Sequence, residues 1–157
     1  MIHVASIERK KFWDIFEEKL IENGEPFTIA YQKKDVNWAA INRSKHHVEN
    51  VAFFDKTLSV DFLIKERKVR INISVKYDLK MIDHLKANKT EIESMITAPV
   101  EWISGTKNPN ALRIQHLIPV EIGNTTNYAD VIDLALPIIM DMIRVCERFA
   151  DKQFFDF

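Results

Sequence analysis

The sequence predicts an α+β domain: a mostly antiparallel sheet on which an N-terminal helix, a middle helix and a long kinked C-terminal helix pack. Residues 58–64 and 69–75 alternate apolar with polar side chains, which is the period of a half-buried strand. Other stretches repeat apolar residues at the spacing of one helix face. Each such element has one apolar face to bury, so these faces pack on one another. A chain of 157 residues can bury a sizeable core, and we expect a single domain over residues 1–157.

The two alternating stretches predict a hairpin, because only the charged residues 65–68 separate them. Pairing Ile64 with Val69 places the apolar residues of both strands on one face. The same register pairs Phe62 with Ile71, Val60 with Ile73 and Leu58 with Val75. The turn lacks the Gly or Asn that a tight two-residue turn prefers.

Three helices are predicted from their caps and their apolar stripes. The first covers residues 7–23 and ends at Gly24, and the second begins after Asp78 and stops before Pro99. The third contains Pro137, which bends the helix or starts a second one. The stripes are Phe12, Trp13, Phe16 and Leu20 in the first helix, Ile82, Leu85, Ile92 and Ile96 in the second, and Val131, Ala135, Ile138, Met142, Cys146 and Phe149 in the third.

Short strands complete the predicted sheet, over residues 27–31, 36–41, 51–54, 100–103 and 111–120. The last of them presents Arg113 and Gln115 outward. The chain ends in Phe154, Phe155 and Phe157, which pack on the domain or mediate self-association. A homo-oligomer formed through the C-terminal helix and this aromatic tail therefore stays an open alternative.

Charged residues are distributed unevenly along the chain. Residues 26–90 hold 13 Lys or Arg and 7 Asp or Glu, whereas residues 91–157 hold 5 and 10. The basic middle predicts a surface for an anionic partner, with phosphate contacts if that partner is nucleic acid. A pI of about 6.5 favours instead a solvated surface of mixed charge, because nucleic-acid-binding domains are typically much more basic. The candidate binding residues are Arg43, Lys45, Lys65, Arg67, Lys68 and Arg70.

Several classes of chemistry are excluded by residue types that the sequence lacks or holds once. Three glycines in the whole chain cannot form a glycine-rich phosphate cradle, and no cofactor is predicted. Cys146 is the single cysteine, so no intramolecular disulfide forms and a cytoplasmic location is expected. No signal peptide and no run of roughly 20 apolar residues is found, so a membrane partner is not expected. His46 and His47 are adjacent and point to opposite sides of an extended backbone, so no metal site is predicted.

The order of helices and strands resembles the core of restriction-endonuclease-like enzymes, which gives an alternative function. Such enzymes hold a divalent metal with an acidic residue on one strand and an acidic-x-Lys motif on the next. On the outward face of the hairpin, Asp61 and Lys76 are the candidates, and Ser74 stands where the second carboxylate belongs. The letters of the motif also occur at residues 66–68, but within the turn. With no further catalytic candidate, the sequence leans away from an enzyme.

Lys89 lies on the apolar stripe of the middle helix, one turn before Glu93. Two interpretations stay open. The lysine stem covers the core while its amine reaches water or pairs with Glu93, or Lys89, Glu93 and Trp102 line a pocket under the edge of the sheet. Lys89 and Trp102 therefore join the candidate binding residues.

Dispersed residues over nearly the whole chain resemble a known family, an uncharacterised bacterial domain of unknown function. They are Phe12 and Trp13, Trp38, Lys89, Ile92 and Glu93, Glu101 and Trp102, and Arg113 and Ile114 before the final helix. In longer proteins this domain is often found C-terminal to a restriction-endonuclease-like nuclease domain. The resemblance implies an association with nucleic-acid or defence systems, and it implies no catalytic residues.

The sequence thus predicts a stand-alone, soluble binding or interaction module. Its partner is nucleic acid or another protein. A metal-dependent nuclease, active or degenerate, and a structural homodimer are the alternatives.

Overall fold

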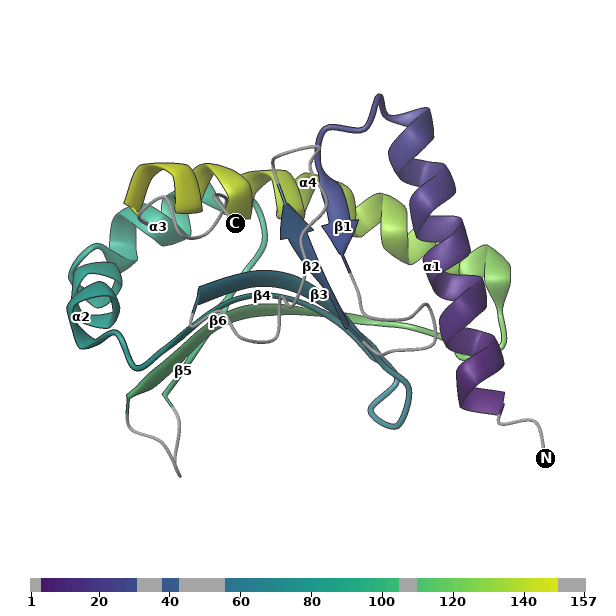
Figure 1. The fold of residues 1–157 in the computed structure, drawn as a ribbon, viewed down its shortest axis with the longest axis horizontal. Coiled ribbons are helices and arrows are strands. Elements are labelled where there is room, and N and C mark those ends of the chain that lie inside the picture. The colour runs from purple at the N-terminus through teal and green to yellow at the C-terminus, as the bar shows by residue number, and fades with distance from the viewer. Residues whose placement is uncertain (1–3, 31–37, 43–55, 105–109, 150–157) are drawn as a thin grey trace.

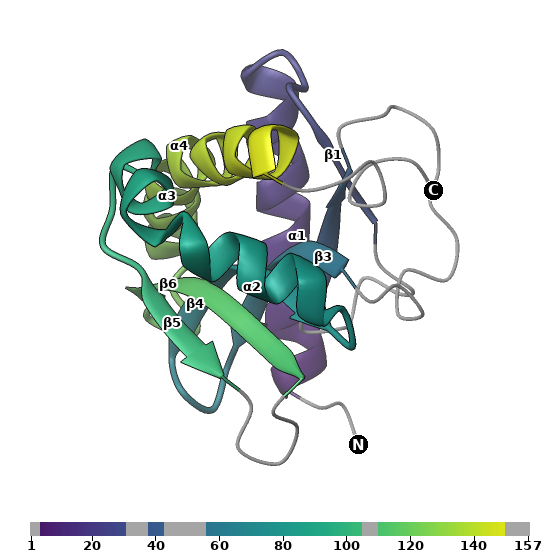
Figure 2. The same cartoon turned by 90° about the vertical axis from the view of Figure 1, so that its left-hand side faces the viewer.

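The computed structural model of the chain describes residues 4–30, 38–42, 56–104 and 110–149. Its elements follow in the order α1 (Val4–Glu22), β1 (Thr28–Ala30), β2 (Trp38–Asn42), β3 (Lys56–Leu63), β4 (Lys68–Lys76), α2 (Leu79–Ala87), α3 (Lys89–Met95), β5 (Glu101–Ser104), β6 (Ala111–Pro119) and α4 (Thr125–Phe149). The described strands form one antiparallel sheet in the order β1-β2-β3-β4-β6-β5, and the helices lie on one side of it (Figures 1 and 2). The predicted α+β class, with N-terminal, middle and C-terminal helices on an antiparallel sheet, is confirmed.

Strand β4 forms the centre of the apolar core. Its odd-numbered residues, Val69, Ile71, Ile73 and Val75, are at most 1% exposed and face the helices. Aromatic side chains continue this core at the junction of α1, β3 and α4. Phe12 stacks on Phe62 with ring centroids 4.3 Å apart, and Tyr128 meets both rings edge-on. The predicted aromatic face of the first helix therefore docks on the sheet and on α4.

The hairpin of β3 and β4 is confirmed, but its predicted register is wrong. Phe62 pairs with Val69 rather than with Ile71, and Val60 pairs with Ile71. The turn occupies four residues, closed by a 3.2 Å hydrogen bond from the Arg67 N–H to the Ile64 carbonyl. Because side chains alternate with a period of two, both registers bury the same apolar residues, and the apolar pattern cannot distinguish between them.

Two predicted helix caps are confirmed. Gly24, beyond the end of α1, has a φ of 78°, the left-handed conformation that glycine adopts without a steric cost. The side chain of Asp78 accepts a 3.0 Å hydrogen bond from the Met81 N–H at the start of α2. The first helix begins at Val4, three residues earlier than predicted.

The predicted single middle helix is wrong, because the structure contains two helices, α2 and α3. They are separated by Asn88, whose side-chain amide donates to the His84 carbonyl at 2.9 Å. A side chain that satisfies a terminal carbonyl competes with continuation of the helix. The predicted apolar stripe of residues 82, 85, 92 and 96 is nevertheless buried in full.

The C-terminal helix α4 continues through Pro137, so the second helix start considered at this proline is not found. Pro137 is exposed, where the backbone carbonyl that it leaves without an N–H donor can bind water. The predicted strand 51–54 and the aromatic tail lie outside the described residues.

Candidate functional site

The face of the sheet that points away from the helices gathers polar side chains from three neighbouring strands. Odd-numbered residues of β3, even-numbered residues of β4 and odd-numbered residues of β6 share this face. The backbone register places Ser59 opposite Asn72, and Asn72 opposite Gln115. We call the following set the polar sheet face: Ser59, Asp61, Arg70, Asn72, Arg113 and Gln115.

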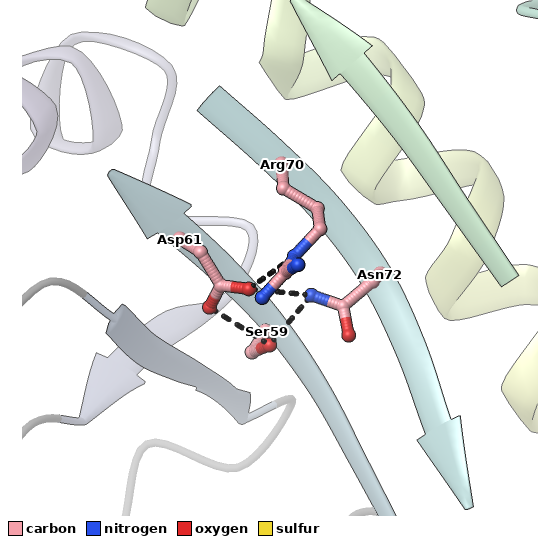
Figure 3. Close-up of polar contacts among 4 residues, drawn as sticks. All are labelled: Ser59, Asp61, Arg70 and Asn72. Atoms are coloured by element: carbon pink, nitrogen blue, oxygen red, sulfur yellow. Dashed lines mark hydrogen bonds and ion pairs between the residues drawn. The ribbon is translucent and has the colours of Figure 1, made fainter. Parts of the chain in front are cut away.

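Asp61 is the centre of a hydrogen-bond network on this face (Figure 3). Arg70 Nε donates to its Oδ2 at 2.7 Å, and Asn72 Nδ2 donates to the same oxygen at 3.0 Å. The Ser59 hydroxyl lies 3.4 Å from Oδ1 and accepts a 3.0 Å hydrogen bond from Asn72. The cross-strand pair of Asp61 and Arg70 creates this network, because antiparallel pairing places the two side chains directly opposite each other.

The network is buried although no described helix covers this face. Asp61 is 5% exposed and Asn72 2% exposed. Burial raises the pKa of the Asp61 carboxyl, and the nearby Arg70 and Arg113 guanidiniums oppose this rise without overcoming it. Burial and repulsion from Arg70 together lower the pKa of Arg113, which stays charged at neutral pH. Asp61 thus binds Arg70 directly and attracts Arg113 only at longer range, in a partly desolvated setting.

Two buried polar atoms of strand β6 have no hydrogen-bond partner among the residues that the structure describes. They are Nε of Arg113, a donor, and Oε1 of Gln115, an acceptor. The two residues are two positions apart and therefore lie side by side on the polar sheet face. Buried polar atoms are nearly always paired, so these two indicate where a polar ligand can bind.

The structure does not bring together the residues of the predicted nuclease site. Arg70, not Lys76, lies opposite Asp61, and Lys76 is six positions further along β4. At about 3.4 Å per residue this separation is about 20 Å along the strand. Ser74 is four positions from Arg70 on the same strand. Among the described residues no group of three His, Cys, Asp or Glu side chains could hold a metal ion.

The predicted basic residues are divided between two places. Lys65, Arg67 and Lys68 are exposed at the turn between β3 and β4, whereas Arg70 belongs to the Asp61 network. Arg67 also lines a surface hollow of about 490 Å³ beside Pro119 and the start of α4. Arg43, Lys45, His46 and His47 lie outside the described residues.

The three residues of the predicted pocket at the middle helix are in contact. Trp102 Nε1 donates to Glu93 Oε1 at 2.9 Å, and Lys89 Nζ lies 5.6 Å from the centroid of the Trp102 ring. Lys89 is therefore placed as a cation over an aromatic face rather than as the partner of Glu93. Lys89 itself is exposed, and a binding role for Lys89 and Trp102 stays a prediction.

Sequence reasoning placed Arg113 and Gln115 outward but did not connect them with Asp61. That connection depends on β6 lying beside β4, although α2, α3 and β5 separate the two strands in the chain. The cross-strand pairing of Asp61 with Arg70 was also missed, because it requires the correct hairpin register. Their opposite charges at matching outward positions were the signal that could have revealed it.

The fold and the polar sheet face define a small α+β domain with helices on one side of its sheet and a buried polar network on the other. The chain belongs to the family described as a domain of unknown function (DUF4268), which matches residues 8–149. The predicted resemblance to an uncharacterised domain is therefore confirmed, whereas an association with a nuclease domain is not shown by this match.

A search of functionally curated proteins found no match. A solved structure of YbjN from E. coli, proposed to be a transcription regulator, matches with 11% sequence identity and a TM-score of 0.44. The match covers 87% of this chain and 92% of YbjN. Within the described residues, no helix is long and apolar enough to cross a membrane.

Proposed function

We propose that this domain is a binding module that holds nucleic acid through phosphate contacts. The observation that supports this most directly is the gathering of cations at one end of the sheet. Lys68 shares its outward side with Arg70 on β4, and the turn before it exposes Lys65 and Arg67. Contacts between such side chains and phosphates supply most of the affinity in nucleic-acid binding that does not depend on sequence.

In this proposal Asp61 is a positioning residue. Its carboxylate accepts hydrogen bonds from Arg70, Asn72 and Ser59, so it is engaged within the protein. Arg70 donates to it through Nε, and the two terminal nitrogens of the guanidinium carry four further N–H donors. A guanidinium fixed at one side can present the other to a phosphate with little loss of rotamer freedom.

The family resemblance supports the same class of partner, because it implies an association with nucleic-acid or defence systems. We include in the proposal that the domain works beside nuclease domains of such systems, as a binding partner without a catalytic site of its own.

The test is fluorescence anisotropy with labelled single-stranded and double-stranded oligonucleotides between about 50 and 200 mM salt. Four phosphate contacts to a duplex, one from each of these cations, should give a slope of log affinity against log salt of about −3.6. The double variant Lys65→Glu, Lys68→Glu should abolish binding or flatten this slope. Its matched control reverses two exposed lysines on helices α1 and α2, Lys10→Glu and Lys86→Glu, and should bind much better than the turn variant.

Binding that does not change with salt would reject the proposal, as would an equal loss of affinity in the turn variant and its control. Absence of binding to either oligonucleotide at the lowest salt would also reject it and leave a protein partner as the remaining candidate.

A further inference from the structure

Strand β6 carries a donor and an acceptor that no residue in the described part of the chain satisfies. Gln115 is 5% exposed, and its Oε1 has no hydrogen-bond partner. Asn72 on β4 lies directly opposite Gln115. Its side-chain amide group donates its hydrogen bonds to Ser59 and to Asp61. The Asn72 amide therefore does not donate to Gln115 Oε1.

Arg113 is in the complementary situation. Its Nε is buried without an acceptor, and its cross-strand neighbours are Ser74 on β4 and Ile103 on β5. The carboxylate of Asp61 attracts it, but Asp61 hydrogen-bonds to Arg70. A partly buried cation without a direct anionic partner is unfavourable, and a bound oxyanion would offset this cost.

We propose that Arg113 and Gln115 form a subsite for a small hydroxylated oxyanion of the sugar-phosphate class. Arg113 Nε donates to an oxygen of the phosphate, and Gln115 Oε1 accepts a hydrogen bond from a hydroxyl of the same ligand. The Cα atoms of same-face neighbours on a strand are about 7 Å apart, which is within the span between the phosphate and the ring hydroxyls of a pentose phosphate.

The local charge selects a hydroxyl rather than an ammonium group as the ligand's donor. Arg70 and Arg113 bring two positive charges to this face, and Asp61 supplies one negative charge. A second cation near Gln115 would be repelled, whereas a neutral hydroxyl is not. This distinguishes a sugar phosphate from an amino acid, which also combines an oxyanion with a donor.

The subsite uses different residues from the basic turn, so it does not depend on the proposed nucleic-acid binding. The sugar phosphate could be a free metabolite or one unit of a nucleic-acid strand, since both carry a phosphate beside sugar oxygens. Short RNA strands provide both the phosphate and the hydroxyl.

Isothermal titration calorimetry with ribose 5-phosphate, ribose and inorganic phosphate tests the subsite on the full chain. We expect ribose 5-phosphate to bind at least about tenfold more tightly than inorganic phosphate, since one more hydrogen bond to a buried acceptor is formed. Ribose alone should not bind detectably. In Gln115→Met this preference should disappear while phosphate still binds, and Arg113→Gln should weaken both anions about tenfold or more.

The matched control is Arg148→Gln, which removes an exposed guanidinium from the helical side and should leave all affinities unchanged. If Gln115→Met or Arg113→Gln fails to fold, NMR of the unmodified protein replaces the variants. The Gln115 side-chain amide and the Arg113 Nε–H resonances should then shift on titration with ribose 5-phosphate and stay in place with ribose.

Three results overturn the subsite: neither anion binds, Gln115→Met keeps the preference for ribose 5-phosphate, or both resonances remain in place. Displacement of ribose 5-phosphate by a short RNA would identify a strand as the source of the ligand, and retention would identify a free sugar phosphate. Either outcome supports the subsite. The Lys65→Glu, Lys68→Glu variant should lose oligonucleotide binding but keep ribose 5-phosphate binding, which separates this inference from the proposed function.

Discussion

Asp61 illustrates a conflict between burial and charge attraction at a single residue. Its carboxylate accepts a hydrogen bond from Arg70 and lies near Arg113, both of which favour the ionised form. Burial nevertheless raises the pKa of the carboxyl above its ordinary value of 3.8. The folded state therefore holds the Asp61 proton more tightly than the unfolded state does, so ionisation of this residue lowers the stability of the fold.

The raised pKa of Asp61 should make the stability of the protein depend on pH. As the pH rises from about 4 through the raised pKa of Asp61, the contribution of this group to the free energy of unfolding should fall and then become constant. Asp61→Asn resembles the protonated form, so it should remove this contribution and leave stability at pH 7 unchanged or up to about 1 kcal/mol higher. Urea unfolding at a series of pH values measures both effects.

Asp61→Ala provides the contrast, because it removes the acceptor of Arg70 and Asn72 altogether. It should lower the free energy of unfolding by about 1–3 kcal/mol. Asp83→Asn, at an exposed carboxylate on α2, should leave the free energy of unfolding nearly unchanged. If Asp61→Asn destabilised the protein as much as Asp61→Ala, attraction to the two arginines would outweigh burial and the stated direction would be wrong.

At the scale of the element, the sequence predicts which face of the β3–β4 hairpin each side chain occupies, but not which residues pair across its two strands. The apolar alternation correctly assigned the buried face. It could not select the register, because a shift of two leaves every side chain on its face. In the observed register Asp61 lies opposite Arg70, whereas the predicted one would place Leu63 opposite this arginine. The polar face therefore distinguishes two registers that are equivalent for the apolar face.

In the hairpin turn, the backbone conformation of Arg67 should lower the stability of the protein. This residue has a φ of 54°, a left-handed conformation that costs about 1–2 kcal/mol for a residue with a Cβ atom. Arg67→Gly should therefore raise the free energy of unfolding by up to about 1 kcal/mol, after the greater flexibility of glycine in the unfolded chain is counted. The backbone hydrogen bond that the Arg67 carbonyl accepts from Val120 is unaffected by the change.

Lys65→Gly is the matched control for Arg67→Gly. It removes one cation from the same turn at a position without a positive φ, and it should destabilise the protein slightly. Urea unfolding of the two variants gives the comparison. Equal destabilisation by both would show that the conformation of Arg67 carries no cost.

At the scale of the whole molecule, the candidate site depends on topology that lies beyond local sequence patterns. Strand β6 inserts between β4 and β5, so Arg113 and Gln115 reach the face that also carries Asp61. Periodicity identified the two hairpin strands and β6, and which of their side chains point outward, but it contains no information on which strands become neighbours. The apolar stripes of the helices were also predicted correctly, but the break between α2 and α3 at Asn88 was not.

We expect the chain to unfold as a single cooperative domain. Phe12 is fully buried where α1, β3 and α4 meet, and Phe12→Ala should cost about 3–5 kcal/mol, a large share of a typical domain's stability. Variants that retain only Trp13, on α1, or only Trp102, on β5, report from elements that lie far apart in Figure 1. Losing the buried Trp13 lowers stability by itself, so each variant is compared with its own parent: Phe12→Ala should shift the urea transition of both by the same amount. A shift at Trp13 with no change at Trp102 would mean that the two ends of the sheet unfold separately and that the domain is not a single cooperative unit.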